Sequence, residues 1–237
     1  ENISMDQYWW WWVIHLWVEA TWEVFVGCLA AYGLIKIIGA RREVVEMWLW
    51  IEVSMLFGSG ILGMGHHYFW IGTPEYWWEI GALFSALEPV PLVAMFVHVI
   101  YDWGKETGIK EGHGSGEKTM NNSPAFAWFV TNAFGNFLGA GIWGFFHTLP
   151  QVNIYTHGTQ FTSAHGHLAF FGAYATILIG MFYMGVQGKN GIKVMKATFA
   201  SKMAITLITA GVMGMTVSLT VAGYGQVLVE RAQMSAT

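Results

Sequence analysis

Four polar residues in two short segments have the spacing of metal ligands. His15 and Glu19 are four residues apart, so an imidazole and a carboxylate share one face of a helix. His66 and His67 are adjacent and diverge by about 100° on an ideal helix. They can still reach one metal near a helix end, where the backbone is less regular. Three imidazoles and one carboxylate oxygen suit iron or another first-row metal, and no thiolate or thioether favours copper.

A second pair of histidines has the opposite geometry. His165 and His167 are two residues apart, which separates their directions by about 200° on a helix. They cannot bind the same metal, but two haems flanking one helix, each bound by one of the two, satisfy the spacing. Gly166 between them leaves room for flat macrocycles to approach the backbone.

The remaining histidines carry weaker signals. His98 and His147 have no partner at helical spacing, and we expect them to be packing residues. His157 precedes a Gly-Thr-Gln sequence, and either an interfacial role or a hydrogen bond to a haem carboxylate fits it. His113 lies in a Gly-rich stretch and is interpreted as a loop residue.

Acidic residues continue the first pattern. Glu23 follows Glu19 by four residues, so both stand on one stripe with His15. Glu88 lies between Leu87 and two prolines, which should kink its helix. Glu23 and Glu88 are therefore candidates for proton delivery, with a structural carboxyl as the alternative for each. Glu52 has no comparable setting and receives no role.

These residues belong to segments that can cross a membrane. Of 237 residues, 54% are hydrophobic and 11% charged, against about 25% charged in soluble domains. A bilayer core needs about 20 apolar residues per helix, and six segments qualify, several long enough to tilt. They are 8–38, 44–71, 77–103, 125–148, 159–186 and 197–228. We predict an all-α polytopic bundle, with residues 1–237 as one transmembrane domain.

Charge in the connections predicts the orientation. Lysine and arginine occur between spans one and two, three and four, and five and six, and the other two connections have neither. By the positive-inside rule the three basic connections, including the solvated loop 104–123, are cytoplasmic and both chain ends lie on the opposite face. The five histidines of the two patterns and Glu19 then share the outer half of the bilayer. An ionisable group there is costly and points to function.

Composition excludes several classes of protein. No basic stripe suggests a nucleic-acid partner, and the net charge of −4 is small. Cys28 is the only cysteine, which excludes an internal disulfide and cysteine-based zinc or iron–sulfur sites.

Four motifs carry a resemblance to a known family. They are 8–19 (YWWWWVIHLWVE), 63–70 (GMGHHYFW), 157–160 (HGTQ) and 164–167 (AHGH). Together they resemble the haem–copper oxidase superfamily and, within it, the catalytic (cytochrome b) subunit of bacterial nitric oxide reductase of the cytochrome c-dependent type. The resemblance spans nearly the whole chain.

The resemblance implies a role for each motif residue. His15, His66, His67 and Glu19 would hold non-haem iron. His165 would be the axial ligand of a high-spin haem b, and His167 an axial ligand of a low-spin haem b. Glu23 and Glu88 resemble glutamates tied to proton supply. The implied reaction reduces nitric oxide to nitrous oxide during denitrification in the bacterial inner membrane, with electrons from a c-type cytochrome subunit and with both chain ends periplasmic.

One departure from the family pattern limits the resemblance. Family subunits have about twice as many spans, and the second axial histidine of the low-spin haem lies on an early helix without a counterpart here. We expect this chain to be the C-terminal part of the subunit, or another chain to supply that ligand. The family's calcium site falls among the same early helices, so calcium is left open.

Two other functions remain as alternatives. Many oxygen-reducing relatives have tyrosine four residues after the first histidine, where this chain has Glu19. The carboxylate favours iron and removes the nearby phenol that oxygen cleavage uses. For both reasons NO is the preferred substrate, and an oxygen-reducing haem–copper oxidase is the second candidate. A non-catalytic haem-binding electron-transfer subunit is the third, although such a subunit needs no open site of three histidines and a glutamate.

Overall fold

The chain forms a bundle of long helices in the computed structural model, which describes residues 2–106 and 120–234. Within these ranges no β-strand occurs, as the sequence predicts. The segments are α1 (Ile3–His15), η1 (Leu16–Trp22), α2 (Glu23–Ile38), α3 (Arg42–Leu62), η2 (Gly63–His67), α4 (Tyr76–Leu87), α5 (Pro89–Glu106), α6 (Ser123–Asn136), η3 (Phe137–Trp143), α7 (Gly144–Thr148), α8 (Pro150–Thr156), α9 (Gln160–Ala169), η4 (Phe170–Ala175), α10 (Thr176–Lys189) and α11 (Phe199–Met234).

Five helical rods of the described chain are long and apolar enough to cross a membrane, one fewer than the six predicted. They are Ile3–Ile38, Arg42–His67, Tyr76–Glu106, Gln160–Lys189 and Phe199–Met234. The predicted span 125–148 is a rod made of α6, η3 and α7. It is less apolar because it carries two buried amides: Asn132 donates to the Gly172 carbonyl of η4, and Asn136 lines the large cavity of the bundle.

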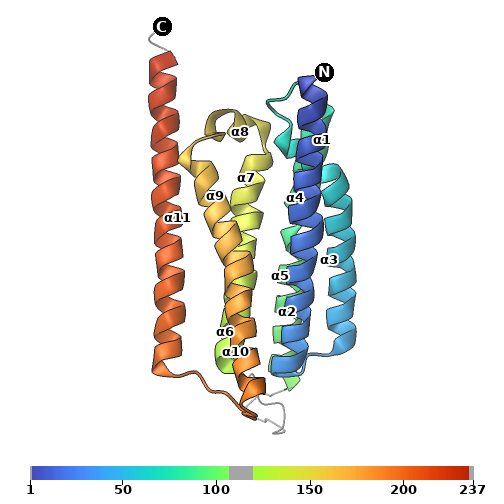
Figure 1. The fold of residues 1–237 in the computed structure, drawn as a ribbon, viewed down its shortest axis with the longest axis vertical. Helices are drawn as coiled ribbons and strands as arrows, with labels where there is room; N and C mark the ends of the chain where they lie inside the picture. The colour runs from blue at the N-terminus through green and yellow to red at the C-terminus, as the bar shows by residue number, and fades with distance from the viewer. Residues whose placement is uncertain (1, 107–119, 235–237) are drawn as a thin grey trace.

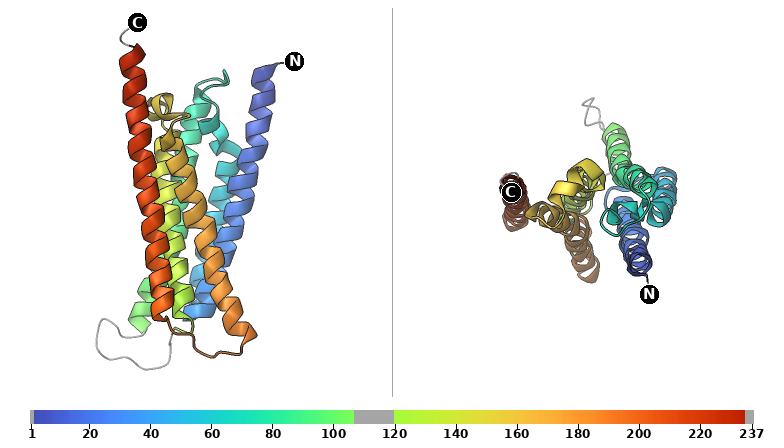
Figure 2. Two further views of the ribbon diagram at one scale, coloured as in Figure 1. Left: turned by 60° about the vertical axis from the view of Figure 1, so that its left-hand side comes forward. Right: turned by 90° about the horizontal axis from the view of Figure 1, so that it is seen from above.

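The helices form two groups that lie side by side. Segments α1 to α5 make one group and α6 to α11 the other, as the view along the bundle shows (Figure 2). Both chain ends lie at the same end of the bundle, with α8 and the α3–α4 connection (Figure 1). This end is called the outer end below. Helix α11 stands at the edge and packs mainly on α9.

The two groups meet in an apolar core that fills the inner half of the bundle. Its buried side chains come from α2, α3, α5, α6 and α10, and Leu34, Met95 and Phe129 are among those with almost no exposed surface. Close backbone approach helps to join the segments of the second group. A Cβ on Gly135 of α6 would lie 2.6 Å from the Cα of Gly172 in η4, so both positions require glycine.

Proline breaks the third span where the sequence predicts a kink. Helix α4 ends at Leu87 and α5 begins at Pro89, which leaves Glu88 at the junction. Helix α5 continues to Glu106, three residues into the predicted loop 104–123. Positions 107–119 of that loop, including His113, lie outside the described residues.

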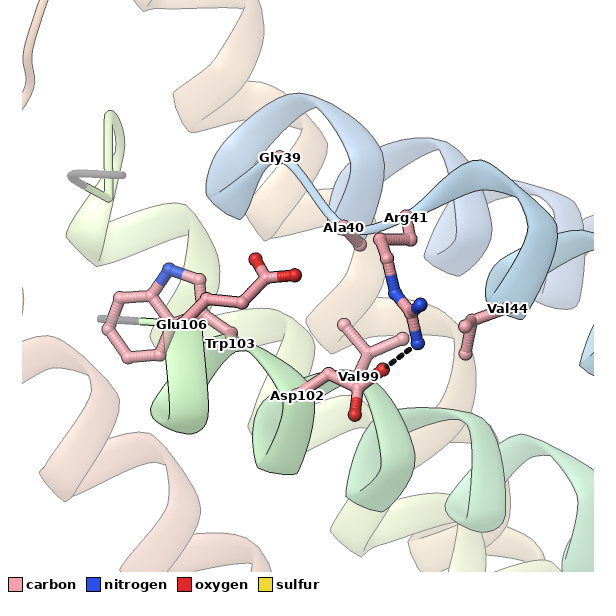
Figure 3. Close-up of a pocket in the computed structure, with 8 residues that line it drawn as sticks. All are labelled: Gly39, Ala40, Arg41, Val44, Val99, Asp102, Trp103 and Glu106. Atoms are coloured by element: carbon pink, nitrogen blue, oxygen red, sulfur yellow. Dashed lines mark hydrogen bonds and ion pairs between the residues drawn. The ribbon is translucent and has the colours of Figure 1, made fainter. Parts of the chain in front are cut away.

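At the inner end of the first group, polar side chains join α5 to α3 and to the turn that precedes α3. Arg41, in the turn between α2 and α3, donates a hydrogen bond to Asp102 of α5 (Figure 3). Asp102 is also 3.6 Å from the Nε2 of His98, four residues earlier, so His98 has a partner at helical spacing, contrary to the sequence expectation. The Nδ1 of His98 accepts a hydrogen bond from Trp48 Nε1 at 3.0 Å. The neighbouring carboxylate raises the pKa of Arg41 further above its ordinary value, so Arg41 stays charged.

At the outer end, an aromatic contact joins α1 to the α3–α4 connection. The rings of Tyr8 and Tyr68 stack with centroids 4.8 Å apart, and Tyr68 donates a hydrogen bond to the Tyr8 carbonyl at 3.0 Å. Burial raises the pKa of the Tyr68 phenol, so the group keeps its proton and remains a donor. This contact fixes the start of α1 beside the connection that follows the paired histidines.

Candidate metal centre and haem cavity

The four residues predicted as ligands of one metal are brought together by three helical segments. Ligand atoms of His15, Glu19, His66 and His67 all lie within 4.8 Å of one another. His15 Nε2 is 2.5 Å from one oxygen of Glu19, and His66 Nε2 is 3.7 Å from the other oxygen. Three imidazoles and a carboxylate therefore converge on one point in the outer half of the bundle.

A π-helical segment positions Glu19 beside His15. Helix α1 ends at His15, and η1 continues as a π-helix from Leu16 to Trp22, with Glu19 in its middle. π-Helical turns are rare and often occur at functional sites. The space for this wider turn comes from Gly60 of α3, because a Cβ there would lie 3.0 Å from the side chain of Ala20.

A short 3-10 helix brings His66 and His67 to the same point. Segment η2 runs from Gly63 to His67, and the two rings lie with centroids 4.2 Å apart. The sequence predicts this convergence only for an irregular helix end, and η2 is such an end. Tight packing on α4 holds it in place: a Cβ on Gly65 would lie 1.6 Å from the Trp77 carbonyl oxygen.

Hydrogen bonds fix the orientation of two of the three rings. His15 Nδ1 lies 3.2 Å from the Gly60 carbonyl oxygen. A carbonyl can only accept, so Nδ1 carries the proton and Nε2 keeps a free lone pair. His66 Nδ1 lies 2.8 Å from Ser85 Oγ, which in turn donates to the Gly63 carbonyl at 3.4 Å. Both rings thus present Nε2 toward Glu19.

The third ring is held by stacking. His67 lies on the indole of Trp11, with centroids 4.7 Å apart and an interplanar angle of 4°. Neither Trp11 nor Ser85 was identified from the sequence. Weak signals existed for both: Trp11 is four residues before His15, and Ser85 is three residues before Glu88, so each shares a helix face with a candidate residue.

A cavity of about 310 Å³ separates this cluster from the second group of helices. His66 and His67 line one side, and His165 of α9 lines the other. His165 Nδ1 donates to the Gly139 carbonyl in the π-helical segment η3 at 2.9 Å, so its Nε2 also keeps a free lone pair. Gly144 stands next to this ring, since a Cβ there would lie 3.2 Å from His165 Cε1.

His167 points away from the cavity, as the spacing of two residues predicts. It is exposed on the described chain, and its Nδ1 donates to the Ser163 carbonyl at 2.7 Å. The ring is therefore fixed by its own helix while its Nε2 faces outward. His167 is not part of the one cluster of three or more potential metal ligands found among the described residues.

The predicted acids lie at the same cavity. Glu19, Glu23 and Glu88 all line it. The carboxyls of Glu19 and Glu88 are side-chain neighbours, and Glu88 is also close to Ser59. The junction of α4 and α5 thus places a second carboxyl beside a candidate ligand.

Two further histidines line the cavity, and their settings differ. His147 uses both ring nitrogens, with the Trp143 carbonyl at 3.0 Å and Thr162 Oγ1 at 3.2 Å, which leaves none for a metal. His157 lies at the outer end of the cavity, with its ring 5.4 Å from that of Trp70.

Tyr174 is a cavity residue that sequence reasoning missed. It belongs to the π-helical segment η4, so α-helical spacing counted from His165 does not predict the direction of its side chain. It lines the cavity and lies within electrostatic range of Glu23, Glu19 and Glu88. The ring of Trp22, 5.8 Å away, holds it against η1.

Comparisons with known proteins identify the family of the chain. The chain matches the family model of cytochrome c and quinol oxidase polypeptide I over residues 2–236. It is 42% identical over 234 residues to a subunit of the nitric oxide reductase of Stutzerimonas stutzeri, in an alignment that covers 98% of this chain and 47% of that protein. The chain thus spans about half the length of the curated relative it matches. The family resemblance predicted from the motifs is confirmed: the chain belongs to the cytochrome c and quinol oxidase polypeptide I family.

Proposed function

We propose that this chain forms the binuclear reaction site of a nitric oxide reductase. The observation that carries the proposal is the convergence of three imidazoles and the Glu19 carboxylate within 4.8 Å, facing His165 across a cavity. The similarity to a protein named as part of a nitric oxide reductase supports the choice of substrate. The proposed reaction consumes two NO, two electrons and two protons and yields N2O and water.

The residues present fit a non-haem iron. His15 Nε2 and Glu19 Oε2 are buried, close together and without a hydrogen-bond partner. Two acceptor atoms in contact repel unless a proton or a cation satisfies both, and a metal ion bound by His15, Glu19, His66 and His67 does so. The contacts of His15 with Gly60 and of His66 with Ser85 are outer-shell hydrogen bonds of the kind that orient metal-binding imidazoles.

The histidines of α9 fit two haems in the same way. His165 offers a free Nε2 to the cavity and would be the axial ligand of the high-spin haem b. His167 offers its Nε2 on the opposite face and would be one ligand of the low-spin haem b. Its second ligand would come from the remainder of the subunit or from a further chain. When bound, the haem and the iron supply electrons and hold two NO molecules close enough to couple.

The chain's own acids would serve proton delivery. Glu88 and Glu19 can share a proton at the edge of the cavity, and Glu23 lies one turn further along the same stripe. The apolar core closes the inner half of the bundle, whereas the cavity lies toward the outer end. We therefore assign proton entry to the outer side. Proton uptake from the inside in a vesicle assay would refute this direction.

The membrane, the orientation and the electron donor that we propose for this chain follow from its family. The chain would be one transmembrane domain of a multi-pass protein in the bacterial inner membrane, with both termini periplasmic and residues 104–123 cytoplasmic. A c-type cytochrome subunit would deliver electrons to the low-spin haem. Calcium, if bound, would use residues outside this chain.

Oxygen reduction by a haem–copper oxidase remains the second candidate, and one observation bears on it. Glu19 replaces the tyrosine of many oxygen-reducing relatives, but Tyr174 places a different phenol at the cavity. The preference for NO therefore rests on the carboxylate in the ligand set, which favours iron over copper. The expectation that replacing the tyrosine leaves the site without a nearby phenol is wrong, because Tyr174 lines the cavity.

The experiment that tests the proposal is an N2O assay of the purified full-length complex supplied with NO and a reductant. We expect N2O formation that Glu19→Gln and His67→Ala reduce strongly while the haem bound at His165 is retained. Oxygen consumption without N2O formation would favour the second candidate. Haem spectra that respond to neither CO nor NO would favour a non-catalytic electron-transfer subunit.

A further inference from the structure

Glu52 is a buried carboxyl that the proposed function does not use. It lies in the middle of α3 with 3% of its surface exposed, and its Oε2 has no hydrogen-bond partner. Burying an ionised carboxylate without a partner is costly, so such a group is held as the neutral acid. Glu52 is therefore a protonated carboxyl inside the membrane segment, and no residue of the described ranges is hydrogen-bonded to its Oε2.

Gly27 of the neighbouring helix α2 leaves space for the Glu52 carboxyl. An ideal Cβ on Gly27 of α2 would lie 2.8 Å from Glu52 Oε1 and 3.1 Å from its Cδ. Gly27 follows Glu23 by four residues and Glu19 by eight. The Glu52 carboxyl thus occupies the third position of the stripe that Glu19 and Glu23 begin, although it comes from another helix.

This position places Glu52 within reach of the acids at the cavity. Successive positions of the stripe are about 6 Å apart along the helix, so the Glu52 carboxyl stands about one helical turn beyond the level of Glu23. Glu23 lies within electrostatic range of both Glu88 and Glu52. The acids therefore form a series from the metal-ligand cluster inward, in the order Glu19 and Glu88, then Glu23, then Glu52.

The series ends at Glu52. Below it, the space between α2, α3 and α5 is filled by apolar side chains, among them Ala30, Val45 and Val99, each with 2% or less of its surface exposed. No buried acid or base of the described chain continues the series through this core. Among the residues that the structure describes, Glu23 is therefore the neighbour with which Glu52 can exchange a proton.

We propose that Glu52 is a proton-holding residue that supplies one proton to the reaction site through Glu23. This inference rests on the proposed function. In the forward step the O–H bond of Glu52 breaks and an O–H bond forms on the Glu23 carboxylate. Glu52 is left as a carboxylate until a proton returns by the same route from the cavity. Glu52 itself touches neither substrate nor cofactor.

Proton counting during the first turnover tests the proposal in the full-length complex. The fully reduced protein is mixed with NO, and a pH dye measures proton uptake from solution. In the wild type we expect one proton fewer to be taken up than in Glu52→Gln, because the glutamine cannot release a proton. Glu79→Gln, at an exposed position of α4, is the matched control and should behave as the wild type. Equal uptake in the wild type and Glu52→Gln would overturn the proposal.

Infrared spectroscopy and an apolar variant separate this role from a structural one. The carbonyl stretch of a protonated acid should be present in the wild type and lost in both Glu52→Gln and Glu52→Leu. Replacing an unpartnered buried carboxyl by an apolar side chain should leave Tm equal or higher. Loss of haem or a lower Tm in Glu52→Leu would show a structural carboxyl and overturn the proposal.

The infrared measurement also separates this inference from the proposed function. It requires only reduction of the bound haems, so it reports on the Glu52 proton even if the complex produces no N2O from NO. A complex that lacks N2O formation but shows the Glu52 band would therefore contradict the proposed reaction, and an active complex without that band would contradict the proton-holding role alone.

Discussion

Ser85 provides a test of the candidate metal centre that leaves every proposed ligand in place. Its hydroxyl lies 2.8 Å from His66 Nδ1 and passes the hydrogen bond on to the Gly63 carbonyl. The side chain is 8% exposed, so no bulk water replaces it readily. In Ser85→Ala the His66 ring loses the contact that fixes its tautomer and its direction toward Glu19.

The expected magnitude follows from the position of this hydrogen bond. Removing an outer-shell partner of a metal-binding histidine typically weakens metal affinity about 10- to 100-fold. This corresponds to about 1.4–2.8 kcal/mol of binding free energy. Haem binding at His165 should not change, because that ring is held by Gly139 from the other group of helices.

Competition with a chelator measures the effect in the purified full-length complex. The non-haem metal of Ser85→Ala should be removed at a lower chelator concentration than that of the wild type, with unchanged haem spectra. Ser218→Ala is the matched control, since Ser218 is an exposed serine whose hydroxyl bonds only the carbonyl four residues earlier in α11. Unchanged metal affinity in Ser85→Ala would refute the assignment of His66 as a ligand, and parallel loss of haem would show a general packing defect.

Three further substitutions test separate parts of the account. Gly81→Ala should abolish non-haem metal binding, because its Cβ would lie 2.6 Å from the backbone nitrogen of His66; elemental analysis measures this. His167→Ala should remove the low-spin haem signal from the optical spectrum and keep the high-spin one, since the two histidines of α9 face opposite sides; loss of both signals would contradict this geometry. Gly33→Ala should lower the free energy of unfolding by about 1–3 kcal/mol without changing metal content, because its Cβ would lie 2.2 Å from an aromatic ring in the inner core. Thermal unfolding compares it with Gly188→Ala, where the new Cβ meets open space.

The helical segments, and which candidate residues share a helix face, could be predicted from the sequence. Both depend on local properties, namely the length of an apolar stretch and the spacing of polar residues along it. The histidine and glutamate at positions 15 and 19 share a face in any helical turn, and the Pro89 break at Glu88 follows from the missing backbone donor. The opposite directions of His165 and His167 likewise need only helix geometry.

The rest depends on contacts between distant segments. The rod 125–148 was predicted as a membrane span from its length, but it carries two buried asparagines. Asn132 donates to an η4 carbonyl and Asn136 lines the cavity. The π-helical segments η1, η3 and η4 have no signature in the residue pattern, yet they border the cavity. Tyr174 was missed for this reason, and Glu52 because only the gap at Gly27 shows where its carboxyl lies.

Metal and haem content of the purified full-length complex is the most direct test of the central claim. Elemental analysis with a pyridine haemochrome spectrum should give two b-type haems, one additional iron and no copper for each catalytic subunit. That result would agree with iron held by His15, His66, His67 and Glu19 opposite the His165 haem. One copper for two haems would contradict the account, and oxygen reduction would become the leading function.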